Sequence, residues 1–131
     1  GGRDPGDVTF LATALREAQE EVGLRPEDVE VLGQLDDIQT TSGFLVQAFV
    51  GLIPPDYAFR PRAWEVAEVL TVPVAHLLDP AHTTFDQRLY RGEWEQAPTY
   101  HYNDHAVWGA TARILQQLLG LIARGEPESL P

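Results

Sequence analysis

The stretch Leu11–Gly23 (LATALREAQEEVG) decides how this chain is interpreted, because it predicts a short amphipathic helix that ends at a glycine. Its apolar residues recur at spacings of four, three and four, which places them on one stripe of a helix. These residues are Leu11, Leu15, Ala18 and Val22. Gly23 stands where helices often end in a left-handed residue. We therefore expect a helix over about residues 9–22.

Three glutamates lie near the C-terminal end of this helix. The helix dipole disfavours Glu20 and Glu21 there by roughly 0.3–1 kcal/mol each. Glu17 and Glu21, four residues apart, repel each other by about 0.2–0.5 kcal/mol. They lie about 40° apart on the helix and could share a divalent ion, while Arg16 could pair with Glu20 and hold the helix rigid. Taken alone, the same pattern is also typical of a solvated acidic surface.

The residues before this helix make the metal hypothesis more specific. The stretch from Gly1 to Leu24 resembles the signature of the Nudix hydrolase family, which reads G, five residues, E, seven residues, REUxEExGU, with U a bulky aliphatic residue. Two positions depart from it, since Val8 replaces the first motif glutamate and Ala18 stands at an aliphatic position. The residues that match are Gly2, Arg16, Glu17, Glu20, Glu21, Gly23 and Leu24.

With Val8 in place of the first motif glutamate, the sequence is similar to the pattern of the coenzyme A diphosphatase branch of that family. Residues 1–7 (GGRDPGD) and 13–17 (TALRE) resemble this branch, and Asp7 to Arg16 has its spacing. The branch has one more residue between Arg3 and Asp4. Because the printed sequence contains no methionine, our hypothesis is that a methionine was left out of it at this point. Later segments that resemble the branch are 35–38 (LDDI), 41–44 (TSGF), 60–69 (RPRAWEVAEV) with 72–74 (VPV), and 105–115 (HAVWGATARIL).

This resemblance implies an α/β fold, an α/β/α sandwich with a mixed sheet and a catalytic loop-helix-loop. The first strands of that fold would precede Gly1, so we expect them to be missing from this chain. Residues 1–124 would form the Nudix domain and residues 125–131 a tail. The implied reaction is hydrolysis of the diphosphate bond of coenzyme A or a derivative, with Mg²⁺ or Mn²⁺. Its products would be 3′,5′-ADP and 4′-phosphopantetheine.

The metal ligands that we expect follow from this resemblance and from the spacing of the acids. Glu17 and Glu21 are the first candidates, because carboxylate oxygens suit Mg²⁺ and Mn²⁺. Glu20 is either a third ligand or the partner that orients Arg16. In the family a backbone carbonyl from the leading glycines often completes the metal shell, which here would be Gly2. The ion would neutralise charge on the diphosphate and lower the pKa of a bound water.

The general base stays open between Glu17 and an acid from a later loop, Glu65 or Glu68, of which Glu65 is expected to be the more accessible. Two other functions also stay open. One is hydrolysis of another nucleoside diphosphate derivative, such as ADP-ribose or a dinucleotide. The other is a binding module of the same fold that has lost catalysis, which the altered motif at Val8 would permit.

Composition limits the partners of the chain. Nine basic and 20 acidic residues give 131 residues a net charge of −11, which argues against binding nucleic acid or an anionic membrane. An anionic substrate of coenzyme A type would therefore need bridging cations. The chain has no cysteine, which excludes disulfides and thiolate sites and fits a reducing compartment such as the cytoplasm. A homodimer is left open.

The remaining pattern predicts the order of the elements. A short helix or turn is expected at 74–78 and a long helix at 106–124. Residues 83–90 and 98–102 are expected to pair as a hairpin. Further strands are expected at about 29–35, 44–53 and 65–72.

Several conspicuous side chains have weaker assignments. We expect Trp108 to pack in the core or against a helix rather than to stack on adenine, whereas Trp64 and Tyr57 could stack on a base. His101 and His105 are separated by an expected turn, and without a third ligand we expect no zinc site there.

Overall fold

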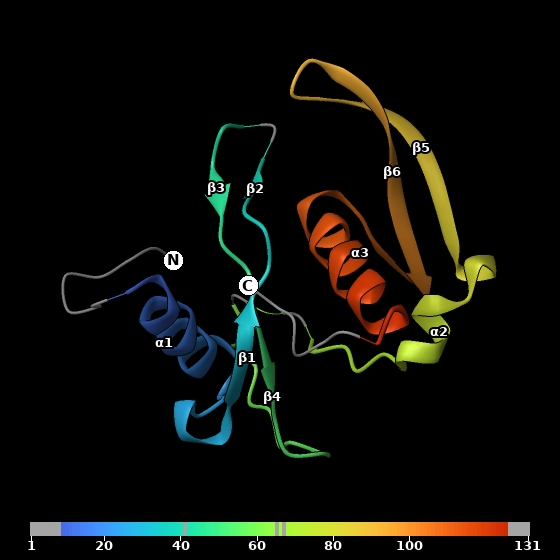
Figure 1. Cartoon of the computed structure of the whole chain (residues 1–131). Helices are drawn as coiled ribbons and strands as arrows, with labels where there is room; N and C mark the ends of the chain where they lie inside the picture. The colour runs from blue at the N-terminus through green and yellow to red at the C-terminus, as the bar shows by residue number, and fades with distance from the viewer. Residues whose placement is uncertain (1–8, 41, 65, 67, 126–131) are drawn as a thin grey trace. The chain divides into compact units, whose positions relative to one another are not determined.

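The computed structural model describes residues 9–40, 42–64, 66 and 68–125. The chain divides into two compact units. The first consists of Gly1–Gly33 and Phe49–Thr71, and the second of Gln34–Ala48 and Val72–Pro131. Figure 1 shows the elements of both.

The first unit begins with helix α1, Phe10–Val22. At its start, the side chain of Thr9 accepts a hydrogen bond from the Ala12 N–H at 3.0 Å, so one of the first free N–H groups has a partner. At its end, Gly23 takes a left-handed conformation with φ 72°, and its N–H donates to the Gln19 carbonyl at 3.0 Å. The predicted helix and its glycine cap are confirmed.

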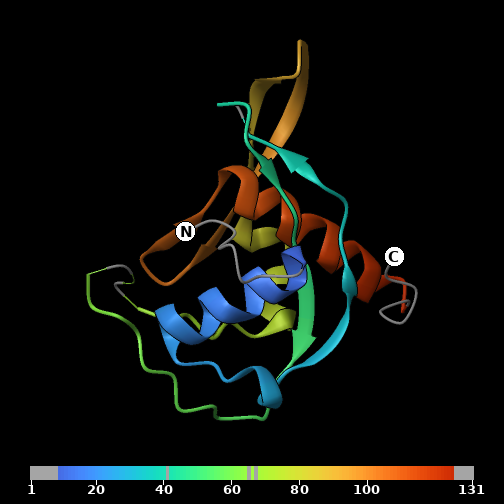
Figure 2. The same cartoon turned by 90° about the vertical axis from the view of Figure 1, so that its left-hand side faces the viewer.

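A short 3₁₀ turn, η1 (Pro26–Asp28), leads from α1 into strand β1 (Glu30–Gln34), which pairs with strand β4 (Phe49–Leu52). The apolar stripe of α1 faces these strands across a hollow of about 280 Å³, and Figure 2 shows α1 beside β4. The apolar residues of α1 that line the hollow are Leu11, Ala14, Leu15 and Ala18.

In the second unit, strands β2 (Ile38–Gln39) and β3 (Leu45–Val46) form a short antiparallel hairpin. Below it, the Leu35 N–H donates to the Ala48 carbonyl at 2.9 Å. The single strand predicted over residues 44–53 is therefore wrong, because it is divided into β3 and β4. Where a strand is interrupted depends on its ladder partner, which intrinsic propensity does not show.

The largest sheet joins β5 (Thr83–Tyr90), β6 (Glu93–Tyr102) and β7 (His105–Val107) in that order, with both ladders antiparallel. Arg91 and Gly92 connect β5 to β6 with φ angles of 53° and 82°, the left-handed pair that a tight two-residue hairpin requires. The predicted hairpin is confirmed, with a longer second strand. Both cartoons show it extending past the N-terminal end of the third helix, α3 (Gly109–Ala123).

The core of the second unit lies between α3 and the sheet. Its buried members are Tyr100, Ala112 and Leu119, and the partly buried residues packed on them are Leu77, Val107 and Leu115. Burial raises the pKa of the Tyr100 hydroxyl. Leu77 comes from the short helix α2 (Val74–Leu78), which was predicted, and the 3₁₀ turn η2 (Pro80–His82) follows it.

Two further predictions about elements are wrong. The last helix begins at Gly109 rather than at Ala106, because Ala106 pairs with His101 in the β6–β7 ladder and Gly109 has φ 68°. Residues 66 and 68–72 were predicted as strand, but they belong to none of the ladders between described residues. A strand needs a partner as well as a suitable sequence.

Among the described residues, no helix combines the length and the apolar character needed to cross a membrane.

We expect Gly23→Ala to lower the free energy of unfolding by about 1–2 kcal/mol, because alanine is strained in a left-handed conformation. The new Cβ would also lie 3.0 Å from the Arg60 Cβ. Gly92→Ala is the matched control, since Gly92 has φ 82° but open space around a Cβ. Urea denaturation of both variants measures the difference. An equal or smaller loss for Gly23→Ala would contradict the close packing at the end of α1.

Candidate active site

The candidate site lies on the C-terminal half of α1. The Arg16 guanidinium donates to the Glu20 carboxylate at 2.9 Å, so the predicted pairing of these two side chains is confirmed. Glu20 is exposed, whereas Glu17 and Glu21 are partly buried. This separates the three acids into one that is held by an arginine and two that lie one helical turn apart.

Glu17 and Glu21 could supply two of the ligands of a metal ion. Within the described ranges, the Glu21 carboxylate has no ion pair or hydrogen bond, and no group of three His, Asp or Glu side chains is arranged to hold an ion. Mg²⁺ commonly binds proteins through one or two carboxylates and fills its other positions with water and substrate phosphates. Two carboxylates one turn apart therefore fit such an ion.

The last carbonyls of α1 are bound by a distant segment of the same unit. The Arg60 N–H donates to the Val22 carbonyl and the Arg62 N–H to the Glu21 carbonyl, both at 2.7 Å. These carbonyls would otherwise lack partners at a helix end. The two donors place positive partial charge where the helix dipole is negative, which favours a last turn that carries acids.

The same contacts place a cationic and aromatic segment at this end of the helix. The Arg62 guanidinium carbon lies 5.5 Å from the centre of the Trp64 ring, within the range of a cation–π interaction. Trp64 is 80% exposed, so its ring can stack on a base, as the sequence suggested. The sequence did not show that the backbone of this segment binds α1; the only signal was the run Arg-Pro-Arg-Ala-Trp.

Two residues that the sequence assigned to the site lie outside the described residues. They are Gly2, the expected backbone ligand, and Glu65, one of the candidate general bases. Glu68, the other candidate base, is exposed. Of the described neighbours of Glu65, the Val66 N–H donates to the Arg62 carbonyl at 2.8 Å. The assignments of Gly2 and Glu65 stay predictions.

Tyr57 anchors the loop after β4 to the connection between α1 and β1. Its hydroxyl accepts from the Arg25 N–H at 3.1 Å and donates to the Asp28 carboxylate at 2.7 Å. The bond from Arg25 favours the phenolate, but the bond to Asp28 and the loss of solvent outweigh it, and the pKa of Tyr57 is raised. Its ring also lies 5.2 Å from that of Phe59. These contacts assign Tyr57 a structural role.

The histidines lie in the second unit. His101 Nε2 is bonded to the Thr84 hydroxyl at 2.9 Å, and His105 Nε2 lies 3.6 Å from the Asp104 carboxylate. The turn that was predicted between them is present at Asn103 and Asp104. The rings of two other histidines, His76 and His82, stack with centres 3.7 Å apart, which no pattern in the sequence indicated.

The side chain of Trp108 is more exposed than the sequence suggested. It was expected to pack in the core or against a helix, but it is 62% exposed. The reason is that Trp108 precedes α3 in an extended conformation with φ −140° and ψ −177°, outside the helix whose apolar face packs on the sheet.

Comparison with known proteins identifies the class of protein. A model of the NUDIX domain family matches residues 1–113. The chain therefore belongs to the NUDIX domain family, as its motif predicted. Enzymes of this family hydrolyse diphosphate bonds and generally use divalent metal ions.

Individual relatives support the same family. The chain is 39% identical over 118 residues to a protein of Photorhabdus laumondii named "Uncharacterized Nudix hydrolase NudL", covering 90% of the chain and 63% of that relative. Proteins of the same name from Citrobacter koseri and Salmonella paratyphi B are 37% and 38% identical over the same length, each covered to 62%. The chain thus spans less than two thirds of the length of these relatives.

We expect Arg62→Pro to lower the free energy of unfolding by about 1 kcal/mol or more relative to Arg62→Ala. Proline removes the N–H that binds the Glu21 carbonyl, and a hydrogen bond contributes about 0.5–1.5 kcal/mol net. Both variants lose the guanidinium, so urea denaturation of the pair isolates the backbone bond. Equal stabilities would contradict its contribution.

Proposed function

We propose that this chain carries the catalytic site of a metal-dependent diphosphatase that acts on coenzyme A or its derivatives. Membership of the NUDIX family and the three glutamates on α1 support the hydrolysis of a diphosphate. The stretch GGRDPGD before the helix supports the coenzyme A branch. The products would be 3′,5′-ADP and 4′-phosphopantetheine.

The observation that carries this proposal is the arrangement of the three acids on the C-terminal half of α1. Glu20 is held by Arg16, whereas Glu17 and Glu21 lie one turn apart and partly buried. Glu17 and Glu21 would hold Mg²⁺ or Mn²⁺, with the Gly2 carbonyl as a further ligand. A bound ion would supply the positive charge that an acidic protein needs to accept a diphosphate.

The other residues of the site would position the reaction. The pair Arg16–Glu20 would keep one face of the helix ordered, and Glu20 would act as the partner that orients Arg16 rather than as a third ligand. The N–H groups of Arg60 and Arg62 bind the last carbonyls of α1, which supports a role for the following residues, Trp64 and Glu65, in the same site. Glu65 would act as the general base that accepts the proton of the attacking water. Glu17 and Glu68 are the alternative candidates for this role.

We expect Glu21→Gln to lower kcat for coenzyme A by about 100-fold or more with Mg²⁺, because the amide loses the charge that binds the ion. The fold should be kept, since the change removes the repulsion from Glu17. Glu27→Gln is the control, an exposed acid paired with Arg25 in the same unit. Product release by liquid chromatography and Mn²⁺ titration measure the effect. Full activity of Glu21→Gln would refute the metal assignment.

We expect the 3′-phosphate of coenzyme A to matter for the rate. Coenzyme A, dephospho-coenzyme A, ADP-ribose and a dinucleotide should be compared with Mg²⁺, with Mn²⁺ and with a chelator. The highest kcat/KM is expected for coenzyme A, with no turnover in the chelator. A preference for ADP-ribose or the dinucleotide would assign the chain another diphosphate substrate. Binding of substrate without products under all conditions would indicate a non-catalytic module.

A further inference from the structure

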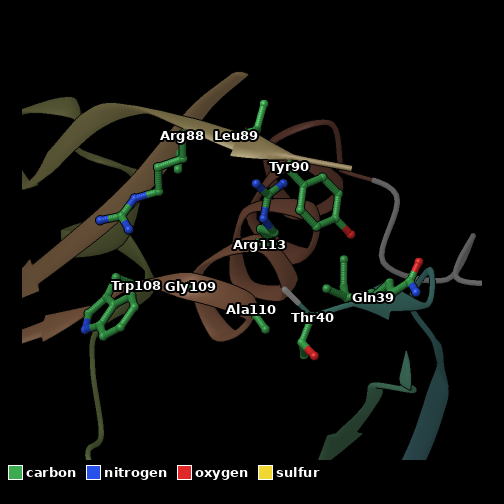
Figure 3. Close-up of a pocket in the computed structure, with 11 residues that line it drawn as sticks. Gln39, Thr40, Arg88, Leu89, Tyr90, Trp108, Gly109, Ala110 and Arg113 are labelled. Atoms are coloured by element: carbon green, nitrogen blue, oxygen red, sulfur yellow. The ribbon is translucent and has the colours of Figure 1, made fainter. Parts of the chain in front are cut away.

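The second unit contains a hollow that has no part in the proposed hydrolysis. Its volume is about 290 Å³, at the lower end of the roughly 300–1,000 Å³ of small-molecule sites. It is formed by the end of β5, the N-terminal end of α3 and the β2 segment, as Figure 3 shows. The residues that line it are Ile38, Gln39, Thr40, Arg88, Leu89, Tyr90, Ala97, Trp108, Gly109, Ala110 and Arg113.

The charged side chains in this lining are all positive, although the chain has a net charge of −11. They are Arg88 and Arg113, and no Asp or Glu lines the hollow among the described residues. An adjoining hollow of about 260 Å³ shares Gln39, Thr40 and Tyr90 and adds Arg91. Three of the nine arginines in the chain therefore gather at one place, which is the electrostatic character of a site for an anion.

The two arginines of the larger hollow differ in how they are held. Arg113 lies 3.8 Å above the Tyr90 ring and forms an ion pair with Glu95, so its position is fixed and its charge is partly balanced. Arg88 lies 3.6 Å from Asp86, but both side chains are about half exposed or more, and such surface pairs contribute little. Arg88 therefore has the more available charge.

An aromatic wall stands beside these charges. The Arg88 guanidinium carbon is 5.6 Å from the centre of the Trp108 ring, and Figure 3 shows the Arg88 side chain directed toward Trp108. Trp108 is 62% exposed, which leaves apolar ring surface in contact with water. Nucleic-acid bases stack on exposed aromatic side chains of this kind. The hollow thus combines a stacking surface with arginines, which suits a ligand that is both aromatic and anionic.

We propose that this hollow binds a nucleoside monophosphate or a ligand of the same chemistry. The base would stack on Trp108, and Arg88 would bind the phosphate, with Arg91 at the adjoining hollow. The volume suits one ring system and one phosphate rather than a dinucleotide. A single-stranded polynucleotide is disfavoured, because the negative charge of the whole chain would repel it. None of the residues assigned to hydrolysis takes part.

The test is binding of AMP to the 131-residue chain, measured by isothermal titration calorimetry in the presence of EDTA. The chelator and the Glu21→Gln background separate this site from the proposed metal site, so binding is expected to persist in both. Adenosine, which lacks the phosphate, and ribose 5-phosphate, which lacks the base, should each bind at least about tenfold more weakly than AMP. No heat of binding up to millimolar AMP would overturn the proposal.

Single substitutions then locate the ligand. Trp108→Ala should weaken AMP binding about fivefold or more, and Arg88→Gln about tenfold or more. Both side chains are exposed, so these variants should fold; circular dichroism checks this. The matched controls are Trp94→Ala, which removes a 70% exposed tryptophan outside both hollows, and Arg25→Gln in the first unit. Unchanged affinity in both test variants, or tighter binding of a short oligonucleotide than of AMP, would overturn the proposal.

Discussion

The C-terminal end of α1 is the constraint on which the candidate site depends. A helix leaves its last carbonyls without partners and carries negative partial charge there, and this helix adds Glu20 and Glu21 at that end. Gly23, in a left-handed conformation, ends the helix, and the N–H groups of Arg60 and Arg62 donate hydrogen bonds to its last carbonyls. The need for hydrogen-bond donors is thus what brings a segment more than 30 residues away in sequence next to the acids.

Charge is distributed unevenly in this acidic chain, and the distribution has consequences for both units. All nine basic residues are arginines, and guanidinium groups can pair with carboxylates and stack on aromatic rings at the same time. In the first unit, Arg16 holds Glu20 and Arg62 lies over Trp64. In the second unit, Arg113 lies between Glu95 and Tyr90. Arginines therefore order acids and aromatics in places where anionic ligands are proposed to bind.

The two proposed sites are built by different means. Spacing within one helix is enough to place Glu17 and Glu21 together, so this pair was predicted from the sequence. The hollow of the second unit needs the β2 segment, the end of β5 and the start of α3 in one place. Its residues are separated by tens of positions in the chain, and none of them forms a motif. The expectation that Trp108 is buried was wrong for a related reason. The amphipathic pattern does not show that α3 begins after Trp108, which leaves this residue outside the helix.

The sequence by itself determined the family, the helix over residues 10–22 with its glycine cap, the Arg16–Glu20 pair and the β5–β6 hairpin. These features depend on interactions between residues close in the chain, which periodicity and spacing reveal. Only the tertiary structure decided that residues 60–62 bind the end of α1, that the strand predicted over 44–53 is divided, and that Trp108 faces solvent beside Arg88. Those outcomes depend on partners distant in sequence, whose backbone donors and packing surfaces no local pattern records.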